Sequence, residues 1–180
     1  MGSRRRLARG ARRRHGDRDV KPHRLEREQW LPAPMERVFA FFADAANLET
    51  LTPPWLGFRI LSALPIAMRP ETRIEYRIAL AGVPLRWRTR IKSWEPGVRF
   101  VDEQERGPYA LWEHTHHFEH CGDGVLMRDV VRYALPLGVL GRIAHAVAVH
   151  SALAAIFDHR FARIRELFPR SRDGEPGRAA

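Results

Sequence analysis

Six short runs between residues 57 and 135 alternate apolar and polar side chains, and a turn signal closes each run. The runs cover residues 57–63, 72–80, 83–94, 98–105, 109–120 and 125–135. A period of two places alternate side chains on opposite faces of a strand, and short connections join antiparallel neighbours. The segment therefore predicts an antiparallel meander with one buried face, and it excludes the strand and helix alternation that builds parallel sheets.

Helical patterns flank the meander on both sides. Residues 25–31 have strand character, Pro34 suits the first turn of a helix, and a second short helix over 45–51 ends before Pro53. After Pro136 a long helix is predicted over about 139–168, where Pro169 ends it. Steps of three and four residues define its stripe, namely Leu140, Ile143, Val147, His150, Ala154, Phe157, Phe161, Ile164 and Phe168. We expect an α+β fold in which a curved seven-stranded antiparallel sheet wraps around a long C-terminal helix, with two short helices after the first strand.

The net charge of +10 is concentrated in the two ends of the sequence. Residues 1–24 carry +8 and residues 169–180 carry +1, which leaves +1 on residues 25–168. The central part is nearly neutral, so we expect no nucleic acid partner for it. We predict a disordered basic tail over 1–23, one folded domain over 24–168 and a disordered tail over 169–180. The basic tail leaves peripheral contact with an anionic membrane open as an alternative.

The single cysteine and the lack of a long apolar run bear on location. Cys121 has no second cysteine with which to form an internal disulfide, and no segment has the length and hydropathy of a membrane span. A cytoplasmic location is therefore expected. The sequence leaves the oligomeric state open.

Several local segments of the predicted domain have a distinctive sequence. One runs from Pro34 through Phe41-Phe42 to Asn47-Leu48 and on to Thr52-Pro53-Pro54-Trp55-Leu56. The others are Gly107-Pro108, Trp112-Glu113-His114-Thr115-His116 and the stretch from Asp129 to Gly138. These segments resemble bacterial members of the START-like superfamily, also called SRPBCC or helix-grip proteins and including polyketide cyclase/dehydrase-like members. The resemblance covers about residues 25–168 and implies a cavity between the sheet and the C-terminal helix that holds a small hydrophobic ligand such as a lipid, quinone or polyketide.

Two classes of function are compatible with such a cavity. The first is a noncatalytic carrier or sensor, and the second is a cyclase, aromatase or dehydratase that uses acid–base chemistry. The sequence has no Gly-x-Ser-x-Gly motif and no phosphate-binding glycine loop. We assign no catalytic residue and expect no cofactor.

Histidines and one aspartate interrupt the apolar rows of the last two predicted strands. Alternation places His114 and His116 on one face, and Asp129 on the apolar face of the next strand. A His-x-His pair is half of a metal site, but spacing gives no third ligand, so no metal is expected. These side chains are either a structural polar cluster or the polar end of the pocket, where they orient an oxygen of the ligand. The register predicts that Glu113, Arg128 and Arg132 face water, and it leaves open whether Asp102 and Gln104 join Phe100 inside.

The remaining candidate ligand contacts are on the inner strands and the long helix. Tyr76 and Trp87 are amphipathic rings on inward faces, where they line the cavity or fill it. On the helix, His150, Ala154 and Phe157 are predicted to form the back wall, with Ala154 leaving room for ligand; His150 as an ordinary core histidine is the alternative.

Overall fold

The computed structural model describes residues 22–80, 82–136 and 148–170. Within them one antiparallel sheet has the strand order β1-β7-β6-β5-β4-β3-β2. The strands are β1 His23–Leu31, β2 Arg59–Ile60, β3 Arg73–Leu80, β4 Val83–Glu95, β5 Arg99–Arg106, β6 Leu111–Cys121 and β7 Gly124–Ala134. The predicted meander is confirmed, and the first strand pairs with the last, with His23 opposite Tyr133.

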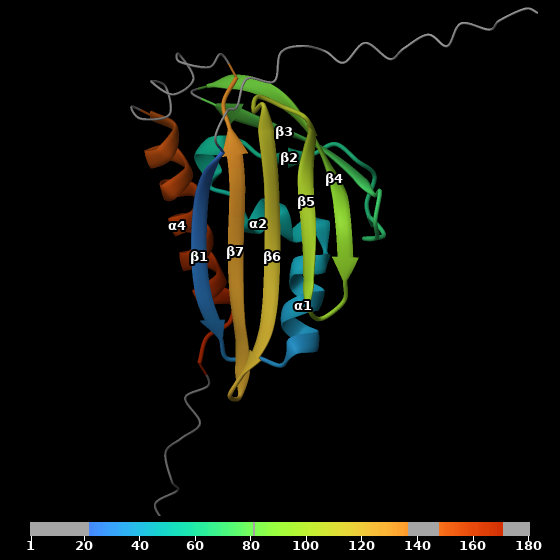
Figure 1. Cartoon of the computed structure of the whole chain (residues 1–180), viewed down its shortest axis with the longest axis vertical. Coiled ribbons are helices and arrows are strands. Elements are labelled where there is room, and N and C mark those ends of the chain that lie inside the picture. Colours follow the sequence, from blue (N-terminus) through green and yellow to red (C-terminus); the bar gives the residue numbers. More distant parts are fainter. Residues whose placement is uncertain (1–21, 81, 137–147, 171–180) are drawn as a thin grey trace, which may run out of the picture.

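The helices lie on one face of this sheet (Figure 1). They are α1 Met35–Ala43, the 3-10 turn η1 Ala45–Asn47, α2 Leu48–Leu51, the 3-10 turn η2 Pro54–Leu56, and α4 His150–Leu167. Pro34 immediately precedes α1, and the Asp44 carboxylate caps η1 by accepting a hydrogen bond from the Ala46 amide at 2.9 Å. The helix-grip arrangement is therefore as predicted. The upstream part of the expected stripe, Leu140, Ile143 and Val147, lies outside the described residues.

Polar contacts as well as apolar packing attach α4 to β1. The buried Gln29 side chain donates to the Phe161 carbonyl at 3.1 Å, and Arg27 pairs with Asp158 at 3.2 Å. Two clusters of buried apolar residues hold the layers together. One joins α1 and the end of α4 to β5, β6 and β7, and the other joins the start of α4 to β1 and β7. The two clusters leave a space between the helices and the middle of the sheet.

Irregular pairing helps β4 bend around that space. The register between β4 and β5 shifts between Arg88 and Thr89 and again between Ile91 and Ser93. Such bulges bend a strand and increase its twist. Because of the second shift, Trp94 packs against Phe39 and Phe100, on the same face as the buried Ile91.

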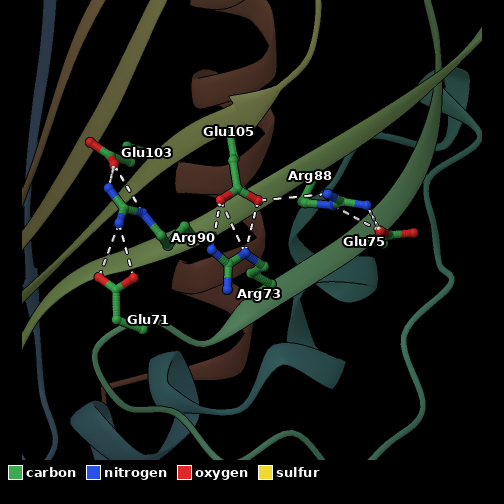
Figure 2. A network of polar contacts seen from close by, with 7 residues as sticks. All are labelled: Glu71, Arg73, Glu75, Arg88, Arg90, Glu103 and Glu105. Atoms are coloured by element: carbon green, nitrogen blue, oxygen red, sulfur yellow. Dashed lines mark hydrogen bonds and ion pairs between the residues drawn. The ribbon is translucent and has the colours of Figure 1, made fainter. Parts of the chain in front are cut away.

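Ion pairs cover the outward face of β3, β4 and β5 (Figure 2). Arg73 binds Glu105 at 2.9 Å, Arg90 lies between Glu71 and Glu103, and Arg88 pairs with Glu75 and Glu105, as Figure 2 shows. The side chains are partly exposed, so water and salt screen the pairs. Within this network the three arginines are balanced by glutamates.

Replacing Arg90 with Gln is expected to have only a small effect on stability. The side chain is 31% exposed, and solvent-exposed ion pairs contribute little to folding. The urea midpoint should fall slightly in dilute buffer, and the difference from wild type should vanish in 1 M salt because the Debye length is then only about 3 Å. A large midpoint shift that persists in high salt would contradict this.

No helix in the described part of the chain is both long enough and apolar enough to cross a membrane. The predicted basic tail lies outside the described residues, apart from its last two positions, and His23 is the first residue of β1.

Candidate functional site

A cavity of about 190 Å³ lies between the inner face of the sheet and α4. Strands β3 to β6 form one wall and α4 forms the opposite wall. Residues from α1 to η2 contribute most of the rest, together with Phe58, Met68 and Tyr109 from the connections between strands. The lining is largely apolar, with an aromatic part and a polar part. The helix contributes Leu153, Ile156, Phe157 and Arg160.

Stacked and tilted rings form the aromatic part. Tyr76 and Trp87 stack with centroids 5.9 Å apart, and Trp87 also contacts Tyr109 at 5.5 Å and Trp112 at 5.3 Å. Cross-strand pairing places Tyr76 opposite Trp87 on β3 and β4. The Trp87 indole Nε1 is buried and makes no hydrogen bond within the described residues. Burial raises the pKa of both Tyr76 and Tyr109, so their hydroxyl groups stay neutral.

A cluster of four polar side chains from β5, β6 and α4 forms one part of the lining, namely Asp102, His114, His116 and Arg160. Register explains their proximity, since Asp102 on β5 lies opposite His114 on β6. Asp102 Oδ2 is 3.2 Å from His116 Nε2 and 3.7 Å from His114 Nδ1. The two imidazole rings are 3.9 Å apart between centroids.

Asp129 on β7 lies behind the histidines and outside the cavity lining. Its Oδ1 is 3.0 Å from His114 Nε2 and 2.8 Å from His116 Nδ1, and its Oδ2 is 3.3 Å from Arg160 Nε. The contact with His114 is a hydrogen bond; the contacts of His116 Nδ1 and Arg160 Nε are ion pairs at short distance without hydrogen-bond alignment. One buried carboxylate thus holds both histidines and the arginine of α4.

Charge in this cluster shifts the pKa values of its members in different directions. Burial and the neighbouring His116 lower the pKa of His114. Burial also opposes the charge on His116, but Asp129 and Asp102 outweigh it and raise the pKa of His116. Burial similarly works against Asp129, yet Arg160 and the two histidines hold the pKa of Asp129 well below its usual range. When His116 is protonated, it adds a second cation to Arg160 beside the carboxylates of Asp102 and Asp129.

Titration of the histidines should separate them. In chelator-treated protein, NMR should show His116 protonating at higher pH than an ordinary histidine and His114 at lower pH. A raised pKa means that the His116 contribution to stability is complete below about pH 6.5 and is lost as pH rises through the folded pKa.

Unfolding measured from about pH 5 to pH 9 should test that sign. The difference in unfolding free energy between wild type and His116→Gln should be largest at the acidic end and decrease toward the alkaline end. The exposed Ser151→Ala is the control, and it should show no such trend because it removes no group that titrates in this range. A difference that grows with pH would contradict the raised pKa.

The structure confirms the predicted facing of β6 and β7. His114, His116 and Asp129 are buried, whereas Arg128 and Arg132 are exposed. Glu113 is on the outward face between Arg132 and Lys92, where the hydrogen bond from Lys92 lowers its pKa. Tyr76, Trp87 and Phe157 line the cavity as expected.

Two residues predicted for the back wall lie elsewhere. His150 is the first residue of α4 and is exposed, and Ala154 is partly buried; neither lines the cavity. The helix turns Leu153, Ile156 and Arg160 toward the cavity instead. These three share one side of Phe157, while His150 and Ala154 are on its other side. Helical spacing places His150 and Ala154 on the predicted apolar stripe of the helix. A small or polar side chain at the edge of such a stripe does not indicate which of its two edges faces the cavity.

The polar part also includes residues that sequence patterns did not assign. The sequence leaves open which way Asp102 and Gln104 face. In the structure Asp102 lines the cavity. The Gln104 side chain donates one hydrogen bond to the Tyr109 carbonyl and accepts another from the Tyr109 amide. Arg160 was not predicted. Its position three residues after Phe157 and four before Ile164 was the available signal, because that spacing puts an arginine on the buried stripe.

Comparison with known proteins agrees with this architecture. The model of the family described as polyketide cyclase / dehydrase and lipid transport matches residues 31–157. The chain belongs to this family. Its members typically bind hydrophobic ligands, as the predicted resemblance to START-like proteins implied. No curated protein matches the sequence.

Several solved structures share this fold at low sequence identity. A protein from Chromobacterium violaceum is 17% identical with a TM-score of 0.63, covering 82% of this chain and 98% of its own. A protein from Mycobacterium smegmatis is 16% identical with a TM-score of 0.60, covering 83% of this chain and 92% of its own. The major latex-like protein 151 of Panax ginseng is 9% identical with a TM-score of 0.60, covering 82% of this chain and 98% of its own.

Proposed function

We propose that this family member is a carrier or sensor of a small hydrophobic molecule with a polar oxygen at one end, such as a lipid, quinone or polyketide-like compound. The observation that carries the proposal is the cavity itself, which is apolar over most of its lining and polar where Asp102, His114, His116 and Arg160 meet. Ligand sites combine an apolar wall with a few polar groups that fix orientation.

Each part of the lining has a distinct role in this proposal. Tyr76 and Trp87 stack against the apolar body of the ligand, and Phe157 closes on it from the helix. His114 and His116 bind the oxygen, while Asp129 positions both rings from behind. A cavity of about 150 Å³ is enough to hold benzene, so about 190 Å³ favours a ligand whose buried part is one or two rings in size.

Native mass spectrometry of the purified full chain tests the proposal. A copurified ligand should add the mass of one small hydrophobic molecule and should be released on unfolding. In ligand-free protein, an apolar fluorescent probe should bind one to one and quench the emission of the two indoles that line the cavity, Trp87 and Trp112, with weaker quenching in Trp87→Phe. Protein that neither carries such a mass nor binds the probe would contradict the proposal.

A second candidate function rests on the histidine pair. Neighbouring titratable groups whose pKa values are pushed apart are typical of acid–base sites, and His114 and His116 shift in opposite directions beside one cavity. A cyclase or dehydratase could use them as base and acid. His116→Gln should then lower turnover of a polyketide-like substrate far more than it weakens binding, whereas a carrier would lose only affinity.

A further inference from the structure

The side chains at the polar part of the cavity converge on one point from two adjacent strands. Asp102, His114 and His116 each offer one ligand atom, and these three atoms all lie within 4.8 Å of one another. Ligands about 2.1 Å from one metal ion are separated from each other by roughly 3 to 4 Å. The distances of 3.2 and 3.7 Å from Asp102 Oδ2 to the two ring nitrogens fall in that range.

From this geometry we propose that Asp102, His114 and His116 bind a divalent transition metal. Two imidazoles and one carboxylate are a donor set suited to Zn²⁺ or Fe²⁺ in a site that keeps positions open. Spacing within β6 gave only the two histidines; the third ligand comes from β5, through the pairing of Asp102 with His114. The site goes beyond the proposed function, since metal binding does not depend on an apolar ligand.

Asp129 supplies the outer support that metal-binding histidines need. A histidine that binds a metal through one ring nitrogen usually donates the other N–H to a carboxylate, which fixes its tautomer and orientation. Here His114 Nε2 is hydrogen-bonded to Asp129 Oδ1 at 3.0 Å, and His116 Nδ1 lies 2.8 Å from the same oxygen as an ion pair without hydrogen-bond alignment. Arg160 in turn holds Asp129 Oδ2 at 3.3 Å. Both rings therefore present their remaining nitrogens to the same side.

That side is the cavity. Asp102, His114 and His116 all line it, whereas Asp129 does not. A metal held by the three would have its open positions toward the ligand space, where an anionic oxygen such as an enolate, phenolate or carboxylate could complete the coordination. Two ring nitrogens converge on the single oxygen Asp102 Oδ2, and of these two only His116 Nε2 is hydrogen-bonded to it. A cation placed between the three atoms would be coordinated by Asp102 Oδ2 and by both ring nitrogens.

Zn²⁺ titration of the chelator-treated full chain by calorimetry tests the proposal, with Co²⁺ as a spectroscopic probe. One equivalent of Zn²⁺ should bind with a Kd of about 1 µM or tighter. Asp102→Asn replaces an anionic ligand with a neutral amide oxygen and His114→Gln removes an imidazole, so each should weaken binding by at least about 100-fold. His117→Gln and His120→Gln are the controls, because these histidines are on the same strand but outside the cavity lining; both should bind as wild type does.

Two results would overturn the site. One is a folded wild-type chain with no one-to-one Zn²⁺ binding, and the other is binding that is lost in the two controls but kept in Asp102→Asn. If a ligand variant fails to fold by circular dichroism, Co²⁺ added to wild type decides: it should broaden the NMR signals of His114 and His116 before those of His117 and His120, and the reverse order refutes the site. Apolar-probe binding measured in chelator reports on the proposed function separately.

Discussion

Asp129→Asn is expected to lower the free energy of unfolding by about 3 to 5 kcal/mol. Asparagine keeps the shape of the side chain but removes the charge that faces both histidines and Arg160. Removing the carboxylate leaves Arg160, and His116 when it is protonated, without this buried counter-ion, which is the most costly way to change such a cluster. Urea unfolding of the purified variant, followed by circular dichroism near neutral pH, measures the loss.

Matched variants separate the charge effect from simple substitution. Asp123→Asn, in the exposed turn between β6 and β7, should change stability by less than about 0.5 kcal/mol. Adding Arg160→Met to Asp129→Asn should recover part of the loss, since it removes the stranded cation. A loss below about 1 kcal/mol for Asp129→Asn alone would mean that the cluster does not depend on its carboxylate.

Ile156→Trp should weaken binding of an apolar probe at least about tenfold, or ~1.4 kcal/mol, while the chain still folds. Ile156 on α4 lines the cavity and is only partly buried, so the larger tryptophan ring can occupy part of the cavity volume. A void accepts added volume that a close-packed core would reject. Fluorescence titration of the probe, in parallel with thermal unfolding, gives both quantities.

The neighbouring position provides the control. Ala155 is exposed on the outer side of α4, so Ala155→Trp adds the same ring without entering the cavity and should bind the probe normally. Unchanged affinity in a folded Ile156→Trp would show that the probe binds elsewhere. If Ile156→Trp unfolds while Ala155→Trp does not, this part of the cavity is packed core.

The fold was predictable because its signals are local and repeated. Alternation marks the inner face of each strand, and the burial of His114, His116 and Asp129 follows from the register that alternation predicts. A one-residue slip would have put all three in water. Proline and glycine at the turns marked the ends of the strands to within a few residues.

The composition of the site was less predictable because it depends on contacts between distant segments. Asp102 meets the histidines only through the β5 and β6 register, and Arg160 meets Asp129 only because α4 crosses the sheet at that place. A helical stripe shows which side is apolar but not which flank faces a void, which is why His150 and Ala154 were misplaced and Arg160 was missed. Hydrophobic periodicity predicts which side chains are buried, but it does not predict where buried side chains fail to fill the space between a helix and a sheet.

Pairing of β1 with β7 also sets the order in which this protein can become functional during synthesis. His23 pairs with Tyr133, so the sheet cannot close until more than 100 residues have left the ribosome. The helix wall, with Phe157 and Arg160, follows later still. Contacts between such distant segments slow folding compared with local ones. A nascent chain therefore exposes the apolar inner face of its meander until the last helix arrives, and chaperone occupancy should persist to the end of translation.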